Sequence, residues 1–367
     1  MKKILYCAST TGHLRSFHLP YLRILRGEGY AVTAAASGTA EGLPEGIGFV
    51  PVPFTKSFTS LNNLKASFRL AKLIRRERFD LILVHTSLAA FFTRLAVRLA
   101  GKGNTRVVNT VHGYLFGEHS SFRRRAVLLT AEKLMASVTD EILTMNEEDT
   151  RIAQQHRLCR GPVVQIDGMG VYRHPFHPAA PEEKKAARKA LGLPEEAFIL
   201  VYAAEFSRRK NQRFLIENLP YLPEDVCLLL PGGGDGPELC RKLAERLGVG
   251  DRVFTPGLLP DTVECLRAAD VCVSSSASEG LPFHVMEAMS AGLPSILSEV
   301  KGHTDLIRKN RAGILFPPED GDAFCRAVQL LRDDPGERAS MGKNALEASA
   351  RYDIEQVLPQ VVPYYRP

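Results

Sequence analysis

The chain has 367 residues, 45% of them hydrophobic and 24% charged. This ordinary globular balance excludes a single small module and a long disordered protein, and it predicts two domains. No stretch approaches the roughly 18 uninterrupted apolar residues of a membrane span, and the start Met1-Lys-Lys-Ile does not lead into a secretory segment, so we expect a cytoplasmic protein.

Seven cysteines are scattered without a Cys-x-x-Cys pair. They indicate buried thiols, and neither a disulfide framework nor a zinc knuckle.

Charge is distributed unevenly along the chain. Residues 1–172 carry 23 Lys and Arg against 13 Asp and Glu, whereas residues 173–367 carry 24 against 28. A basic first half favours an anionic partner such as nucleic acid, a phosphorylated substrate or an acidic bilayer surface. A solvated basic face without a partner is an equally good interpretation.

Short β-rich runs alternate with amphipathic stretches along the whole chain. The runs in the first half span residues 4–8, 31–36, 81–84, 107–110, 142–144 and 163–166. Residues 172–182, with three prolines, break the periodicity and predict a linker before a helix over 183–191. The runs in the second half span residues 199–203, 226–230, 271–274, 295–297 and 314–316. Alternation at these lengths predicts an α/β protein with two doubly wound parallel sheets, whose ligands bind where the strands end.

The segment from Val271 to Pro294 carries the most information about chemistry. The predicted strand 271–274 is followed by a loop with Glu279 and Gly280, then by a helix with Pro282 at its first position and Gly292 at its end. The amides of residues 280–284 and the positive end of that helix would form an anion site suited to a diphosphate. Glu279 and Glu287 are placed to accept hydrogen bonds from sugar hydroxyls. Taken alone, they could equally be a helix-start charge and a surface residue.

This segment resembles the signature of retaining, nucleotide-sugar-dependent glycosyltransferases of family four, of the bacterial exopolysaccharide or capsule type. The resemblance covers essentially the whole chain and implies the GT-B fold, in which two Rossmann-like domains face each other across a cleft. It implies an acceptor-binding domain over 1–172, a nucleotide-sugar-binding domain over 173–351, and a segment at about 352–367 that crosses back to the first domain. It also implies that Glu279 contacts donor-sugar hydroxyls and that Glu287 holds the nucleotide ribose. The donor-binding loop then consists of Gly280, Leu281, Pro282 and Phe283.

A second constellation is the run from Ala203 to Asn211, directly after the predicted strand 199–203, which contains Arg208, Arg209 and Lys210. Three consecutive cations suit a diphosphate whose negative charge grows as the glycosidic bond breaks. Lys210 matches the diphosphate-binding lysine of the family. Because the family often has Gly-Arg where this chain has Ala204-Glu205, either Arg208 or Arg209 is expected to supply the second positive charge. A solvated loop is the alternative.

Histidines follow several strands of the first half. His112, in the run Asn109-Thr-Val-His-Gly, matches the His-Gly loop of the family, in which the histidine lies at the donor sugar beside the reacting carbon. We therefore expect His112 to orient a sugar hydroxyl or the acceptor and not to act as a nucleophile, whereas His85 is interpreted as structural. In the loop after the first strand, Gly12 is expected to offer its amide to the donor diphosphate and His13 to face the acceptor.

Two glycine-containing loops fail the Gly-x-Gly-x-x-Gly fingerprint, which disfavours a nicotinamide enzyme. The first has Gly12 alone, and in the run from Gly232 to Pro237 the final glycine is replaced by proline. The later run is similar to the family's glycine loop near the nucleotide base, or it is a plain turn. The resemblance also places residues 301–304 near the donor, without a role for any of them.

Cations recur at helical spacing in the first half. One predicted helix face carries Lys65, Arg69, Lys72 and Arg76, and another helix opens with Arg123, Arg124 and Arg125. Both are candidates for reversible contact with the anionic inner face of the cell membrane, since each cation near such a surface contributes about 1 kcal/mol. Solvated helix faces are the alternative. Nucleic-acid binding is disfavoured because no recognition motif accompanies the charge.

These features together predict a hexosyltransferase that uses a nucleoside-diphosphate sugar, UDP being the family's commonest nucleotide, and a glycan or polyprenyl-diphosphate-linked acceptor in surface polysaccharide biosynthesis. Lys210, Glu279 and His112 are the expected catalytic residues. We predict no metal and no other cofactor, because the basic loop would replace a divalent ion at the diphosphate. The resemblance implies retention. Because no carboxylate in the strand-end loops of the first domain is an obvious covalent nucleophile, we favour a same-face mechanism in which the leaving diphosphate helps to deprotonate the acceptor.

Two alternatives remain open at this point. A sugar-nucleotide epimerase of the same general fold would convert the donor without an acceptor. A nucleotide-sugar-binding partner subunit without catalysis would be favoured by Glu205 in place of the family's arginine, although Glu279, Glu287, Lys210 and His112 weigh against it.

Overall fold

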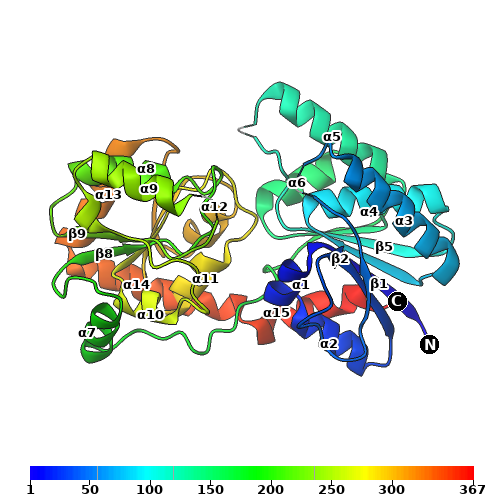
Figure 1. The fold of residues 1–367 in the computed structure, drawn as a ribbon, viewed down its shortest axis with the longest axis horizontal. Helices are drawn as coiled ribbons and strands as arrows, with labels where there is room; N and C mark the ends of the chain where they lie inside the picture. Colours follow the sequence, from blue (N-terminus) through cyan, green and yellow to red (C-terminus); the bar gives the residue numbers. More distant parts are fainter. Residues whose placement is uncertain (56, 119, 235) are drawn as a thin grey trace. The chain divides into compact units, whose positions relative to one another are not determined.

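The computed structural model describes residues 1–55, 57–118, 120–234 and 236–367. The chain divides into two compact units (Figure 1). The first unit comprises Met1–Gly170 together with Glu355–Pro367, and the second comprises Val171–Ile354. Each unit is built around its own parallel sheet, and each is described separately below.

The sheet of the first unit has seven strands in the order β3-β2-β1-β4-β5-β6-β7. Neighbouring strands pair in parallel throughout. The bounds are β1 (Lys3–Thr10), β2 (Ala31–Ser37), β3 (Gly48–Pro51), β4 (Leu81–His85), β5 (Arg106–Val111), β6 (Glu141–Thr144) and β7 (Val163–Gln165). Because β1 and β4 are adjacent, the strand order reverses direction between them, and the loops that follow these two strands diverge at that point.

Helices connect these strands and cover the sheet. They are α1 (Thr11–Phe17), α2 (Leu19–Gly27), α3 (Leu61–Glu77), α4 (Ser87–Ala100), α5 (Phe122–Ala136) and α6 (Glu147–Gln155). Helices α3 and α5 both pack against α4. The end of the chain, α15 (Ile354–Val361) and the 3-10 turn η4 (Val362–Tyr365), returns to this unit and buries Val357, Val361 and Tyr365.

The sheet of the second unit has six strands in the order β10-β9-β8-β11-β12-β13, again with parallel neighbours. The strands are β8 (Phe198–Val201), β9 (Val226–Leu229), β10 (Val253–Phe254), β11 (Val271–Ser274), β12 (Ser295–Ser298) and β13 (Gly313–Phe316). Its α-helices are α7 (Pro181–Ala190), α8 (Gln212–Asn218), α9 (Pro237–Arg246), α10 (Val263–Ala268), α11 (Phe283–Ser290), α12 (His303–Ile307), α13 (Gly321–Asp333) and α14 (Pro335–Ser349). Short 3-10 turns are η1 (Leu219–Tyr221), η2 (Gly250–Arg252) and η3 (Ala350–Tyr352). The order reverses between β8 and β11.

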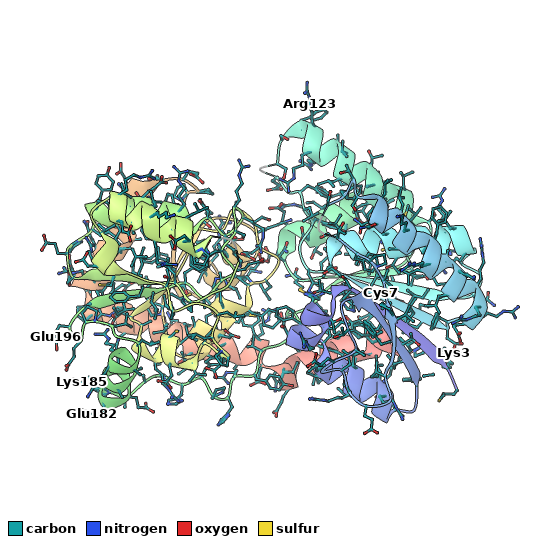
Figure 2. The ribbon with its side chains drawn as sticks, viewed as in Figure 1. Lys3, Cys7, Arg123, Glu182, Lys185 and Glu196 are labelled. Carbon is teal, nitrogen blue, oxygen red and sulfur yellow. The ribbon has the colours of Figure 1, made fainter. Side chains whose placement is uncertain are left out.

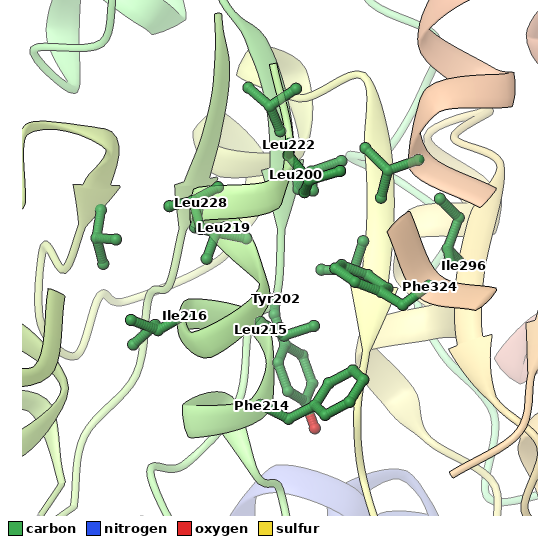
Figure 3. Packing of buried hydrophobic residues seen from close by; sticks show 14 of the residues in the cluster. Leu200, Tyr202, Phe214, Leu215, Ile216, Leu219, Leu222, Leu228, Ile296 and Phe324 are labelled. Carbon is green, nitrogen blue, oxygen red and sulfur yellow. The ribbon is translucent and has the colours of Figure 1, made fainter. Parts of the chain in front are cut away.

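The core of the second unit lies between its sheet and the helices. Figure 3 shows Leu200, Leu228 and Ile296 of the strands gathered with Leu215 of α8 and Phe324 of α13. Burying an aliphatic or aromatic side chain of this size contributes about 1.5–3 kcal/mol. The sheet and its strand ends are thereby held in fixed positions, which is what a site made of loops requires.

The eleven β-rich runs of the sequence all coincide with strands, and the prediction of two doubly wound α/β domains is confirmed. Strands β3 and β10 were not predicted. The first is a four-residue edge strand with no buried residue that ends at Pro51, and the second is only two residues long, so neither gives a recognisable strand pattern. The predicted helix at 183–191 begins earlier, at Pro181. Of the cysteines, six are buried as expected and Cys159 is partly exposed.

Candidate active site

The structure joins Lys210 and Glu279 at the strand ends of the second sheet. Lys210 follows β8 and Glu279 follows β11, the two adjacent strands between which the strand order reverses. The Nζ atom of Lys210 lies 2.6 Å from Oε1 of Glu279, and both residues are only 8% exposed. Two residues 69 positions apart therefore form one buried ion pair at the place where an open parallel sheet binds its ligands.

Arg209 completes a triad of charges with this pair. Its guanidinium lies 3.0 Å from Oε1 of Glu279 and donates a hydrogen bond of 2.9 Å to the carbonyl of Ser278. Both arginines are exposed, and half of the Arg209 side chain is accessible to solvent. Of the two arginines that the sequence left open, Arg209 is the one that contacts the Glu279 carboxylate.

A group of serines after β11 ties the two loops together. The hydroxyl of Ser275 donates to the carbonyls of Asn211 at 2.7 Å and Lys210 at 3.3 Å, and that of Ser276 donates to the carbonyl of Arg209 at 3.2 Å. In addition, the phenol of Tyr202 donates a hydrogen bond of 3.1 Å to the Lys210 carbonyl. The sequence analysis did not single out these positioning residues, although the run Ser274-Ser275-Ser276 directly after a buried strand was a usable signal.

Electrostatics keep the pair ionised. Burial by itself would raise the pKa of the Glu279 carboxyl, but the charges of Lys210 and Arg209 outweigh burial and lower it well below its usual range. Burial also lowers the pKa of Lys210, while Glu279 counteracts that effect. Desolvation lowers the pKa of the neighbouring His303 to about 4 and that of His284 well below its ordinary value, so both imidazoles are neutral at pH 7. The net result is a buried carboxylate surrounded by cationic and neutral nitrogen donors.

Glu287 has a different environment. It lies within α11 and accepts a hydrogen bond of 3.1 Å from the hydroxyl of Thr262, the residue before α10. Desolvation raises the pKa of its carboxyl to about 7, against the opposing effect of that hydrogen bond. The environments of the two glutamates of the predicted signature therefore shift their pKa values in opposite directions: Glu279 is held ionised, whereas Glu287 is about half protonated near pH 7.

The loop Gly280–Phe283 begins helix α11 one position later than predicted. Pro282 has extended backbone and caps the helix, and Phe283 is the first helical residue. Gly302 packs directly on this loop, because a Cβ atom at Gly302 would lie 2.6 Å from the carbonyl oxygen of Gly280. Residues around 302, which the sequence placed near the donor without a role, therefore support the backbone of the expected donor loop.

The glycine run near residue 234 packs against the segment between β8 and Lys210. Gly234 forms a parallel bridge with Phe206, and a Cβ atom at Gly232 would lie 2.0 Å from the carbonyl oxygen of Ala204. Close backbone approach explains these glycines. Asp235 of the same run lies outside the described residues.

The expected residues of the first unit gather at the ends of β1, β4 and β5. The ring centroids of His13 and His112 are 5.0 Å apart, and Nε2 of His112 lies 3.2 Å from Nδ1 of His85. His18, whose ring lies 4.9 Å from that of His13, belongs to the same group and was not predicted, although it follows His13 by little more than a helical turn. Gly12 is exposed in the first turn of α1, whose N-cap Thr10 accepts a hydrogen bond from the amide of His13.

The two predicted basic clusters of the first half lie on helices α3 and α5. Lys65, Arg69, Lys72 and Arg76 are exposed along α3. Arg123 lies at the start of α5 and points away from the body of its unit (Figure 2), next to Arg124 and Arg125. Within the described ranges, none of the helices has the length and apolar character needed to cross a bilayer.

Comparison with known proteins decides the family. Residues 19–168 match the family model described as a glycosyl transferase 4-like domain, and residues 183–348 match the model for glycosyl transferases group 1. The EpsD protein of Bacillus subtilis (strain 168), named as a glycosyltransferase, is 32% identical over 367 residues, which cover 99% of this chain and 96% of the relative. The chain belongs to the family-four glycosyltransferases.

Further relatives agree with this assignment. An Escherichia coli protein named UDP-Gal:alpha-D-GlcNAc-diphosphoundecaprenol alpha-1,3-galactosyltransferase is 28% identical over 295 residues, 78% of this chain and 74% of that protein. The structure of HepE from Anabaena with UDP and glucose has a TM-score of 0.78 at 20% identity, covering 100% of this chain and 99% of that one. Sucrose-phosphate synthase from Thermosynechococcus elongatus has a TM-score of 0.79 at 23% identity, covering 100% and 98%. The GT-B fold and the glycosyltransferase class expected from the sequence are thus confirmed.

Proposed function

We propose that this glycosyltransferase moves a hexose or N-acetylhexosamine from a nucleoside-diphosphate sugar, a UDP sugar, to a glycan or polyprenyl-diphosphate-linked saccharide, with retention of configuration, in surface polysaccharide biosynthesis. Support for a lipid-linked acceptor and a UDP sugar comes from the name of the E. coli relative. Support for uridine diphosphate comes also from the HepE structure.

The observation that carries the proposal is the buried contact of Lys210 with Glu279, 2.6 Å long, beside Arg209 and at the end of β11. A donor that binds here brings its own negative charge to the two cations and its hydroxyls to the carboxylate. Lys210 and Arg209 then stabilise the charge that develops on the departing diphosphate, a contribution that grows toward the transition state. Glu279 accepts hydrogen bonds from the donor sugar, and Glu287 holds the ribose.

Transfer itself follows a same-face course in this proposal. The bond between the anomeric carbon and the diphosphate oxygen breaks, and the acceptor oxygen bonds to the same face of that carbon. The acceptor proton passes to the leaving diphosphate, so atoms and charges balance without a protein nucleophile. His112 and His13 of the first unit orient the sugar hydroxyl and the acceptor, and the contribution of the protein is positioning and charge stabilisation.

Contact with the inner membrane surface would bring the enzyme to a lipid-linked acceptor. On α3 the exposed cations Lys65, Arg69, Lys72 and Arg76 run beside exposed apolar side chains: Leu61 is 70% exposed and Phe68 is 64% exposed. Helix α5 repeats the combination, with Phe122 86% exposed directly before its three arginines. Cations beside apolar groups suit an anionic lipid headgroup region, where the former pair with phosphates and the latter enter the acyl boundary.

The function is tested by incubating the protein with a panel of nucleoside-diphosphate sugars, with and without a polyprenyl-diphosphate-linked saccharide. We expect a glycosylated lipid only when both are present, and we expect NMR of the product to show the anomeric configuration of the donor. Isomerised donor in the absence of acceptor would replace the proposal with an epimerase. Donor binding with neither transfer nor isomerisation across the panel would instead identify a nucleotide-sugar-binding subunit.

A pair of variants ties activity to the ion pair. Lys210→Met should reduce kcat/KM by about 100- to 1000-fold, because the variant loses the ammonium group that stabilises the charge on the diphosphate in the transition state. It should also destabilise the second unit, since Arg209 is the ion-pair partner that Glu279 then keeps among the described residues. The double variant Lys210→Met/Glu279→Gln removes both buried charges, so its stability should recover while its activity stays low. Recovery of activity in the double variant would contradict the assigned roles, and Arg208→Ala, in the same loop, serves as the control.

A further inference from the structure

Two buried histidines of the second unit carry ring nitrogens that the chain itself does not pair. His284 lies in the first turn of α11 and is 8% exposed, and His303 begins α12 and is fully buried. The Nε2 atoms of both rings are buried and have no hydrogen-bond partner among the described residues. Buried polar atoms in proteins are nearly always paired, so these two nitrogens indicate a ligand that supplies the missing partners.

The proton of His303 can be placed from the contacts of its ring. The Nδ1 atom lies 2.8 Å from the carbonyl oxygen of Ser298, which can only accept a hydrogen bond. The Ser298 hydroxyl, 3.3 Å from the same nitrogen, donates its own hydrogen to the carbonyl of Ser276 at 2.6 Å. Nδ1 therefore carries the proton. Because desolvation lowers the pKa of His303 to about 4, the ring is neutral at pH 7 and its Nε2 atom can only accept.

The segment around His303 is held beside the ion pair of the candidate site. Ser276 also donates to the carbonyl of Arg209 at 3.2 Å, so a chain of hydrogen bonds connects the His303 ring to the loop after β8. A Cβ atom at Gly302 would lie only 3.2 Å from the Cβ atom of Glu279. His303, the next residue, therefore lies close to the Glu279 carboxylate.

His284 approaches the same charges from α11. Its ring centroid lies 5.2 Å from that of Tyr202, whose phenol donates to the Lys210 carbonyl. Burial lowers the pKa of its imidazole, on which Lys210 and Glu279 act with opposite signs, so this ring is also neutral. Lys210 and Arg209 both contact the Oε1 atom of Glu279, which makes Oε2 the oxygen expected to accept from a sugar hydroxyl.

We propose that His303 and His284 determine the specificity for the donor sugar, and that Nε2 of His303 accepts a hydrogen bond from one sugar hydroxyl. This inference rests on the proposed function, because it adds contacts to the sugar that Glu279 is proposed to bind. A carboxylate oxygen and the Nε2 atom of His303 both accept, so the sugar must bring a hydrogen to each of them. The proton of His284 is not fixed by a contact among the described residues, so this ring can pair with a second hydroxyl as donor or acceptor.

The substrate class that fits is a hexose or N-acetylhexosamine with free hydroxyls. A hexuronate that turned its carboxylate toward His303 would leave Nε2 unpaired and would bring a negative charge close to Glu279. A deoxy sugar that lacks the hydroxyl read by His303 would likewise leave a buried acceptor without a partner. A site built to pair with a hydroxyl rejects analogues that lack it much more strongly than an apolar pocket does.

The test compares donors that differ by one hydroxyl. Calorimetry measures the binding of UDP, UDP-glucose, UDP-galactose and UDP-N-acetylglucosamine to the intact protein, and the tightest sugar donor is compared with its deoxy analogues at C3, C4 and C6. We expect one analogue to bind about 100-fold more weakly, because it leaves Nε2 of His303 unpaired. His303→Phe has no acceptor, so this preference should disappear. His303→Gln keeps an acceptor oxygen near the position of Nε2 and should retain most of the preference, and His284→Phe should lower the preference at another hydroxyl.

UDP separates sugar recognition from folding, since it lacks the sugar. Its affinity should be the same in the unmodified protein and in both His303 variants, and the exposed His177 of the same unit gives the control His177→Phe, which should keep every preference. Equal losses of UDP and sugar-donor affinity would assign His303 a structural role and overturn the proposal. So would an unchanged preference in His303→Phe, or equal binding of all deoxy analogues by the unmodified protein. Failure of UDP to bind would contradict the proposed function itself, whereas these outcomes contradict the inference alone.

Discussion

At the scale of single residues, the candidate site depends on two carboxyl groups with opposite environments. Glu279 is surrounded by Lys210 and Arg209 and stays ionised, whereas Glu287 faces the hydroxyl of Thr262 and is desolvated enough to raise its pKa to about 7. A carboxyl whose pKa is raised in the folded state binds a proton that the unfolded chain would release. Its neutral form therefore stabilises the fold at low pH, and that stability is lost as the pH rises.

This linkage gives a prediction for Glu287→Gln, which mimics the neutral form. The pKa rises from 4.5 to about 7 on folding, so the free energy of unfolding of the unmodified protein, relative to the variant, should fall by about 3 kcal/mol between pH 4.5 and pH 7 and stay constant above. Denaturant unfolding of both proteins at pH 5 and pH 8 measures the change. Glu182→Gln, at an exposed position on α7, should show no such trend, and a pH-independent difference for Glu287→Gln would contradict the desolvation of its carboxyl.

At the scale of elements, α3 has a buried apolar side and an exposed side of different composition. Ala66, Leu70 and Ile74 pack into the core of the first unit. The solvent side carries two neighbouring rows, an apolar one with Leu61, Leu64 and Phe68, and a cationic one with Lys65, Arg69, Lys72 and Arg76. Helical spacing of three and four residues produces both rows.

A membrane role of α3 predicts that removing two of its cations weakens binding to anionic vesicles. Lys65→Gln/Arg69→Gln should lower the partition coefficient by about 30-fold in low salt, since each cation near an anionic surface contributes about 1 kcal/mol. Co-sedimentation with phosphatidylglycerol vesicles measures it. The matched control Arg241→Gln/Lys242→Gln removes two exposed cations of α9 in the second unit. Equal losses in the two variants would assign the effect to net charge and contradict a role for α3, and binding to neutral vesicles should be weak throughout.

At the scale of the whole molecule, the end of the chain stabilises the unit in which the chain begins. Tyr365 is fully buried against Tyr6 and Tyr21 of the first unit, and its phenol oxygen lies 2.7 Å from the hydroxyl oxygen of Thr110 in β5. The ring of Tyr365 also contacts His85 of the histidine cluster, with centroids 5.7 Å apart. Residues more than 250 positions apart in sequence therefore share one core.

Tyr365→Ala should consequently destabilise the first unit by about 3–5 kcal/mol, the cost of emptying a buried aromatic site. Hydrogen exchange is expected to accelerate in β1 and β5 while β8 and β11 keep their protection, because the cavity belongs to the first unit alone. The neighbouring Tyr364 is partly exposed, so Tyr364→Ala is the matched control and should have little effect. Equal acceleration in both units would show that the tail does not act locally.

Much of this protein could be predicted from the sequence because its signals are local. Apolar runs of three to six residues mark buried parallel strands, and Pro and Gly mark the ends of helices, so eleven strands and the two doubly wound domains followed from pattern alone. Lys210, Glu279 and Glu287 could be named because each lies in a loop or helix that follows a predicted strand and because their segments resemble the motifs of the family. Strands β3 and β10 could not be predicted, since β3 ends at a proline and β10 has only two residues.

Only the tertiary structure decided which of these residues meet. Three contacts depend on which strands are neighbours in each sheet. In the second unit, Arg209 contacts Glu279, and Ser275 and Ser276 bind the loops after β8 and β11 together. In the first unit, His18 lies beside His13 and His112. The pKa of Glu287 likewise depends on burial that its own helix does not supply. Local sequence determines the elements because backbone propensity and side-chain periodicity act over a few residues. The site is determined by contacts between segments far apart in the chain, whose proximity and desolvation exist only after the sheets have formed.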